Sequence, residues 1–138
     1  MKLQFLISLL LLIAACACAP STAPALANTK WALTSITYNG VTQTPPPGAT
    51  ITLDFTNDNH VTGNSGCNTY TGNLVTQSNI LKISGLVSTL RACADQTMND
   101  FEGLYLGKLY EGQLYTITNN QLKITFEGDK GTFLFTAQ

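Results

Sequence analysis

This 138-residue sequence has little charge, a single histidine and, after its first fifteen residues, no long apolar run. Asp, Glu, Lys and Arg together make up 11% of the chain, against about a quarter in average globular proteins. The basic residues are scattered singly and the net charge is -1, so a cationic surface for nucleic acid is not expected. No later segment reaches the roughly 18 to 20 apolar residues of a membrane-spanning helix. What remains is a polar, uncharged chain with the length of one modest domain.

The first fifteen residues have the pattern of an export signal. Lys2 precedes an apolar segment at 3–13 that is too short for a membrane-spanning helix. Ile-Ala-Ala-Cys at positions 13–16 then resembles the lipobox of bacterial lipoproteins, in which a peptidase cuts before a cysteine that receives lipid. We therefore predict a signal peptide at 1–15 and lipidation of Cys16.

Two other interpretations of the N-terminus stay open. An ordinary secretory signal could be cut after residues 25–27, and Cys18 could replace Cys16 as the anchor. Ala17 follows the anchor, and by resemblance to enteric lipoproteins a residue other than Asp there implies delivery to the outer membrane. We expect a protein of the cell envelope, facing the periplasm, with residues 16–29 as the lipidated cysteine and a flexible Pro/Ala/Ser/Thr-rich tether.

From Lys30 onward, short apolar/polar alternations bounded by turn residues predict half-buried strands. Three consecutive prolines at 45–47 predict a loop, because proline lacks the backbone donor that a central strand needs. The last three strands follow one another through short turns and should form a meander of hairpins. The expected strands are 31–38, 50–56, 60–63, 69–75, 80–84, 114–118, 122–126 and 132–135.

One interval, from Asp95 to Tyr110, has the three- and four-residue apolar spacing of a helix. Two glycines inside it, Gly103 and Gly107, weaken it by up to about 1 kcal/mol each, so the helix should depend on packing against the sheet. A single helix inserted among antiparallel strands makes the predicted fold class α+β, β-dominated. The stripe consists of Met98, Phe101, Tyr105 and Leu109.

The segment from Gly63 to Gly72 has glycines where a strand needs side chains, so we expect a bulge or bend within it. It contains Cys67, and a second cysteine, Cys93, lies just before the predicted helix. In an oxidising compartment two such cysteines are most simply a disulfide. Closing that loop would stabilise the fold by about 3 to 4 kcal/mol in the chain-entropy model.

The segments 63–72 and 89–93 resemble the META/HslJ family of small envelope domains. The family pattern is Gly-x-x-Gly/Met-Cys-Asn-x-Phe/Tyr-x-Gly, followed by Thr-x-Met-x-Cys at the start of a helix, and Arg91 stands here where Met is common. We therefore predict one META/HslJ-like domain over 30–138. The residues that match the family motif are Gly63, Gly66, Cys67, Asn68, Tyr70, Gly72, Thr89 and Cys93.

This resemblance implies a cracked, barrel-like antiparallel sheet interrupted by one helix, similar in shape to the lipoprotein pilots of bacterial secretion systems. Members of the family are associated with envelope or heat stress, with novobiocin resistance and, in protozoa, with secretion and virulence. The resemblance implies no particular ligand.

Two groups of residues suggest specific chemistry but also have simpler interpretations. Cys67 with Asn68 and the nearby His60 has the residue types of a Cys-His-Asn hydrolase, but the thiol would have to stay reduced beside Cys93 in an exported protein. Asp54 and Asp58 flank a turn that could bind Ca²⁺ weakly, yet turn chemistry explains these residues equally well. We expect no catalytic residue, no metal and no cofactor.

Other polar residues have structural interpretations. Asn68 should satisfy backbone groups in the bend rather than bind a ligand. Four tyrosines could line a pocket, although tyrosines on barrel and helix faces are usually core residues with a hydrated hydroxyl. They are Tyr70, Tyr105, Tyr110 and Tyr115.

The leading functional hypothesis is a non-enzymatic envelope lipoprotein that binds an unknown partner protein or acts in stress or antibiotic resistance. The membrane contact would be the lipid anchor, and nucleic acid is not an expected partner. The alternative is a carrier of a lipid or another small hydrophobic ligand inside the cracked barrel. An enzyme is the third hypothesis, and the sequence offers no convergent acid, base and nucleophile for it.

Overall fold

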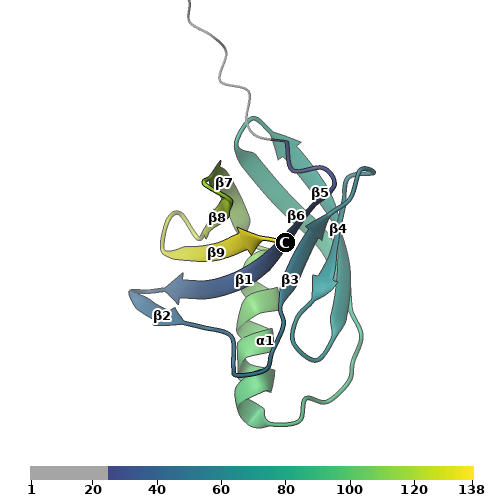
Figure 1. The fold of residues 1–138 in the computed structure, drawn as a ribbon, viewed down its shortest axis with the longest axis vertical. Helices are drawn as coiled ribbons and strands as arrows, with labels where there is room; N and C mark the ends of the chain where they lie inside the picture. The colour runs from purple at the N-terminus through teal and green to yellow at the C-terminus, as the bar shows by residue number, and fades with distance from the viewer. Residues whose placement is uncertain (1–24) are drawn as a thin grey trace, which may run out of the picture.

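The computed structural model describes residues 25–138, and the predicted signal peptide and Cys16 lie outside this range. Among residues 25–138, no helix has the length and apolar character needed to cross a membrane. Figure 1 shows the strands curving around one another, with the helix crossing the lower half of the view. The elements are β1 Thr29–Tyr38, β2 Val41–Gln43, β3 Thr52–Phe55, β4 His60–Asn64, β5 Thr69–Gln77, β6 Ile80–Ser88, α1 Gln96–Leu109, β7 Gly112–Thr118, β8 Gln121–Phe126 and β9 Gly131–Ala137.

The sheet closes on itself because β1 pairs with β3 along one edge and with β9 along the other. The result is a closed antiparallel barrel of eight strands, with the short β2 added beside the end of β1. The predicted fold class is therefore confirmed. The join between β6 and β7 is the narrowest one, since Ile80 with Leu114 is the one residue pair in register there. The chain leaves the sheet between these two strands to form α1.

Alternation along the strands fills the barrel interior with side chains. In β8, for example, every second residue is buried, as expected for a strand with one face toward a core. In β1 a bulge between Leu33 and Ser35 shifts the register against β9, which lets Ile36 point inward three residues after Leu33. The side chains with no exposed surface include Leu53, Val61, Leu81, Leu122, Ile124, Phe126, Phe133 and Phe135.

The helix begins where the sequence indicated. Asp95 is its N-cap residue and accepts a hydrogen bond from the Met98 backbone at 2.8 Å, which satisfies one of the free donors of the first turn. The four stripe residues are all buried. Tyr105 is fully buried, and its ring lies edge-on to Phe133 with centroids 5.6 Å apart. The helix is thus held by its contact with the barrel core.

Three of the differences from the sequence-based assignments have a clear physical cause. The strand β2 was not predicted, because its three residues are all exposed and show no apolar alternation. The strand β6 continues past Ser84 through Gly85, which adopts a positive φ of 59° that glycine tolerates, and ends at Ser88. The predicted tether also extends too far, since Leu26 is only 4% exposed and joins the core.

Two glycine substitutions should have opposite effects on stability. A Cβ at Gly131 would overlap the buried ring of Phe126, so Gly131→Ala should lower the free energy of unfolding by about 1 to 3 kcal/mol. A Cβ at Gly103, within α1, meets no heavy atom within 4 Å, so Gly103→Ala should raise it by up to about 1 kcal/mol. Urea denaturation of both variants checks the pair, and changes of the same sign would contradict the packing described here.

Candidate functional site

The bend predicted in the glycine-rich segment is a tight turn from Ser65 to Asn68, between β4 and β5. The Ser65 backbone N–H donates to the carbonyl of Asn68 at 2.8 Å, and the Gly66 N–H donates to the side chain of Asn64 at 2.7 Å. Gly66 has φ of +117°, a conformation that side chains with a Cβ rarely adopt. A Cβ there would also overlap the Met98 side chain of α1. The turn therefore lies directly against the start of the helix.

The side chain of Asn68 joins this turn to the segment that precedes the helix. Its Nδ2 donates to the backbone oxygen of Arg91 at 3.1 Å, and its Oδ1 accepts from the Arg91 N–H at 2.8 Å. The Thr89 hydroxyl also donates to Oδ1, at 2.8 Å. Asn68 is 4% exposed, so these bonds satisfy an amide that would be costly to bury alone. The backbone groups that the Asn68 side chain satisfies are thus those of Arg91, outside the bend, whereas the expectation placed them within it.

Glu102, a buried acid on α1, occupies the centre of the cluster. Its Oε1 accepts from the Ser65 hydroxyl at 2.5 Å and from the Asn68 N–H at 3.0 Å, and its Oε2 accepts from Asn68 Nδ2 at 2.7 Å. The residue is 8% exposed, and among residues 25–138 no Lys, Arg or His pairs with it. The carboxyl group is therefore held in place by three hydrogen bonds from the Ser65–Asn68 turn.

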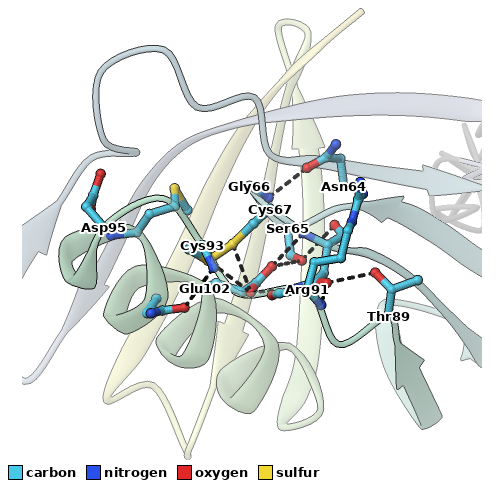
Figure 2. The surroundings of a disulfide bond; sticks show 12 residues. Asn64, Ser65, Gly66, Cys67, Thr89, Arg91, Cys93, Asp95 and Glu102 are labelled. Carbon is cyan, nitrogen blue, oxygen red and sulfur yellow. Dashed lines mark hydrogen bonds between the residues drawn. A yellow bond between two sulfur atoms is a disulfide. The ribbon is translucent and has the colours of Figure 1, made fainter.

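The structure joins Cys67 and Cys93 by a disulfide, with Cα atoms 5.4 Å apart. The bond links the turn to the residue two positions before the helix cap, across 26 residues of sequence. Figure 2 shows the Glu102 carboxylate directed at the two sulfur atoms, with its Oε2 3.2 Å from the sulfur of Cys67 and 3.5 Å from that of Cys93. The two sulfurs and a carboxylate oxygen of Glu102 are atoms of the kinds that bind metal ions, and they lie within 4.8 Å of one another.

A pair of tyrosines continues the contact between β5 and α1 into the core. The hydroxyls of Tyr70 and Tyr105 lie 2.7 Å apart, within hydrogen-bond distance of each other. The backbone oxygen of Thr52 lies 2.7 Å from the Tyr70 hydroxyl and 3.3 Å from the Tyr105 hydroxyl. Gly63 is required beside them, because a Cβ there would overlap that oxygen and the Tyr70 ring. Burial raises the pKa of both phenols well above the ordinary value, since the charged form would lose its hydration.

The structure brings Cys67, Asn68 and Cys93 of the predicted motif together around the side chain of Glu102. Glu102 was not among the residues predicted from the sequence. The signal was present: Glu102 lies four residues after Met98 and three before Tyr105, so it interrupts an apolar helical stripe with an acid. An acidic side chain on the buried face of a helix requires hydrogen-bond donors from another element. Which element would supply them was not readable from the sequence.

The other candidate groups lie apart from this cluster. The ring of His60 has its Nδ1 2.9 Å from the backbone oxygen of Asp58, at the turn before β4. Asp58 accepts from the Thr56 hydroxyl, which lowers the pKa of its carboxyl. Asp54 pairs instead with Lys30, at 3.4 Å. The two aspartates therefore have separate partners.

A groove of about 690 Å³ lies where β6 and β7 diverge, beside the C-terminal end of α1. Three of its lining residues are large and apolar yet exposed: Ile80 at 49%, Tyr110 at 59% and Leu114 at 39%. Tyr110 also lines a second groove of about 280 Å³ with Leu86, Val87 and Leu106. Of the four tyrosines considered from sequence, Tyr110 is exposed at these grooves, and Tyr70 is largely buried but also lines the second one. Tyr105 and Tyr115 are buried.

One edge of the larger groove is formed by an ion pair between α1 and the turn after β8. Glu127 lines the groove and pairs with Lys108, whose Nζ also lies 4.5 Å from the centre of the Tyr38 ring. The hydrogen bond between the two charged groups raises the pKa of Lys108 and lowers that of Glu127. Both groups are therefore charged at neutral pH at this edge.

Comparison with known proteins identifies one family. A family model described as META domain matches residues 24–138, and no curated protein matches the sequence. The chain is similar to an NMR structure of a protein from Burkholderia xenovorans, with 26% identity and a TM-score of 0.72 over 88% of this chain and 93% of that one.

Two further structures share the fold at lower identity. One is an NMR structure with 23% identity and a TM-score of 0.61, covering 80% of this chain and 90% of that one. The other is a crystal structure of a DUF4847 family protein from Bacteroides vulgatus, with 15% identity and a TM-score of 0.56, covering 80% and 93%. At these identities the similarity concerns the fold alone.

Removing the Asn68 side chain should destabilise the domain strongly. Asn68→Ala leaves the backbone groups of Arg91 and one oxygen of Glu102 without their partners, so the free energy of unfolding should fall by about 2 to 4 kcal/mol. Asn99→Ala is the control, because Asn99 is exposed and accepts one long bond of 3.4 Å from Cys93; it should cost less than about 1 kcal/mol. Equal losses in urea denaturation would contradict the assigned role.

The buried tyrosine pair should make the domain sensitive to alkali. Since the folded pKa of each phenol is raised, their contribution to stability is fully present below about pH 10 and is lost as the pH rises toward the folded values. Above pH 10 the loss should approach about 1.4 kcal/mol per pH unit for each tyrosine. Denaturation measured from pH 8 to pH 11 checks this, with Tyr70→Phe giving a shallower slope and the exposed Tyr110→Phe as control. A Tyr70→Phe slope equal to that of the wild type would argue against the pair.

Proposed function

Because this chain belongs to the META domain family, we propose that it is a non-enzymatic cell-envelope lipoprotein whose barrel binds a partner protein through its surface. The export signal and the lipobox-like Ile-Ala-Ala-Cys at 13–16 support an anchor at Cys16, and Ala17 supports an outer-membrane location facing the periplasm. The family resemblance supports a role in envelope stress or antibiotic resistance.

The observation that carries the proposal is the apolar groove at the divergence of β6 and β7. Ile80, Tyr110 and Leu114 expose large apolar surfaces around it. Contiguous apolar surface rimmed by polar groups is typical of interaction sites. Lys82 and Glu111 supply such polar groups at the rim of this groove.

The backbone at the same place favours a protein partner. β6 and β7 share one residue pair in register, so most of β6 is paired with a strand on one side, β5. Strand edges of this kind offer N–H and C=O groups to an added extended segment, and adjacent apolar side chains then give specificity. A partner segment with apolar residues at alternate positions fits this arrangement best.

The cysteine chemistry supports a binding role over hydrolysis. While Cys67 is bonded to Cys93, its sulfur is not a thiolate and cannot act as the nucleophile toward a substrate carbonyl. The buried Glu102 is engaged by Ser65 and Asn68 rather than directed at a substrate cavity. These contacts give the motif residues a structural role.

A carrier of a small hydrophobic ligand is the second candidate, and the same groove favours it. Its volume of about 690 Å³ lies within the range of small-molecule sites, about 300 to 1,000 Å³. The barrel interior is occupied by side chains such as Phe126, Phe133 and Tyr105, so the ligand would lie in the groove and not inside the barrel. Native mass spectrometry distinguishes the candidates, since a carrier should retain a lipid or similar molecule.

A photo-crosslinking residue placed at Tyr110 tests the leading candidate. In cells that express the full chain, this variant should give a discrete crosslinked protein, and a second substitution, Ile80→Lys, should reduce the yield severalfold by placing a charge in the apolar contact. The matched control places the crosslinker at Val41, which is equally exposed at 60% but belongs to β2 and does not line the groove. No product at Tyr110, or the same product from Val41, would count against partner binding at this surface.

A further inference from the structure

Once the Cys67–Cys93 disulfide is reduced, both cysteines and the buried Glu102 have side chains that can bind a metal ion. The sulfurs of Cys67 and Cys93 and a carboxylate oxygen of Glu102 lie within 4.8 Å of one another. Thiolate and carboxylate together are typical ligands of Zn²⁺ and similar thiophilic divalent cations. In the oxidised protein the sulfur–sulfur bond prevents this use.

The carboxylate of Glu102 is already oriented for coordination. Ser65 and the backbone of Asn68 donate to Oε1, and the Asn68 side chain donates to Oε2. These three hydrogen bonds hold the carboxylate in one orientation. Oε2 lies 3.2 Å and 3.5 Å from the two sulfur atoms and still has a lone pair for a metal. Hydrogen bonds that orient a ligand in this way strengthen metal sites.

The distances also suit tetrahedral geometry. With Zn–S bonds of about 2.3 Å and a Zn–O bond of about 2.0 Å, the oxygen–sulfur edge of a tetrahedron is about 3.5 Å. The observed separations from Oε2 are 3.2 Å and 3.5 Å, so the oxygen is placed almost correctly for both sulfurs. Only the sulfurs must move, to about 3.8 Å apart.

The charge at this place favours a cation as well. Glu102 is 8% exposed and has no cationic side chain as partner among the described residues. Cys67 and Cys93 are both only partly buried, so an ion can reach the site from solvent. A bound divalent cation would neutralise the carboxylate and the two thiolates in part.

We propose that Cys67, Cys93 and Glu102 form a redox-gated site for a thiophilic divalent cation such as Zn²⁺. A dithiol reductant opens the site: the Cys67–Cys93 bond breaks, the two sulfurs take up two electrons and two protons, and the reductant's own sulfurs become joined. The cation then displaces both thiol protons into solvent as two metal–sulfur bonds and one metal–oxygen bond form. The turn stays attached to the helix start in both states, through a covalent bond or through a metal.

Cd²⁺ titration of the reduced protein tests the proposal. The full chain carries Cys16→Ser and Cys18→Ser, so that Cys67 and Cys93 are its two remaining thiols, and it is reduced with a phosphine that is then removed without oxygen. One equivalent of Cd²⁺ should bind with thiolate-to-metal absorption and raise the melting temperature, because the ion binds the folded state. The oxidised protein should show neither effect.

Paired variants separate this site from simple binding to two thiols. Glu102→Gln should weaken Cd²⁺ binding at least about tenfold and reduce the rise in melting temperature, because the carboxylate ligand is lost. Asp100→Asn removes the same charge from an exposed position of the same helix and should bind Cd²⁺ as the parent does. Equal binding by Glu102→Gln and the parent, binding by the oxidised protein, or no stoichiometric binding would each overturn the proposal. None of these results bears on partner binding at the β6–β7 groove.

Discussion

The carboxylate of Glu102 is the contact on which the arrangement of the site depends. One acidic side chain on α1 receives three hydrogen bonds from the Ser65–Asn68 turn, and the same turn reaches the helix start through Cys67 and Cys93. A buried carboxylate is costly unless it is fully hydrogen-bonded, so the turn and the helix specify each other's position. The disulfide then limits how far they separate on unfolding, with a stabilisation of about 3.5 kcal/mol in the chain-entropy model.

Much of the barrel could be predicted because its strands alternate cleanly. In β8 and β9 every second side chain is buried, so pattern alone located both strands and the hairpin between them. The short β2 was missed, since it is an exposed extension with no buried face and exists through its pairing with β1. Leu26 was assigned to the tether because a single apolar residue carries no period, and only tertiary packing shows that it is buried.

The site was predictable in part. The two cysteines and Asn68 were found from their motif and compartment, and the structure places them around one turn. Glu102 was missed because its partner Ser65 lies 37 residues away, and such a contact has no local signature. The groove at the β6–β7 divergence was also missed, since it arises from an incomplete strand pairing that alternation cannot show.

Hydrogen exchange of the Asn68 backbone amide in a Glu102→Ala protein tests the role of the carboxylate most directly, because that amide donates to Oε1. With the disulfide kept intact, exchange at Asn68 should become at least about tenfold faster. The Asn39 amide, which donates to the backbone oxygen of Lys130 at 3.1 Å and not to the Ser65–Asn68 turn or to α1, should keep its protection. Unchanged protection of Asn68 would show that the disulfide alone holds the turn against the helix, in contradiction to this account.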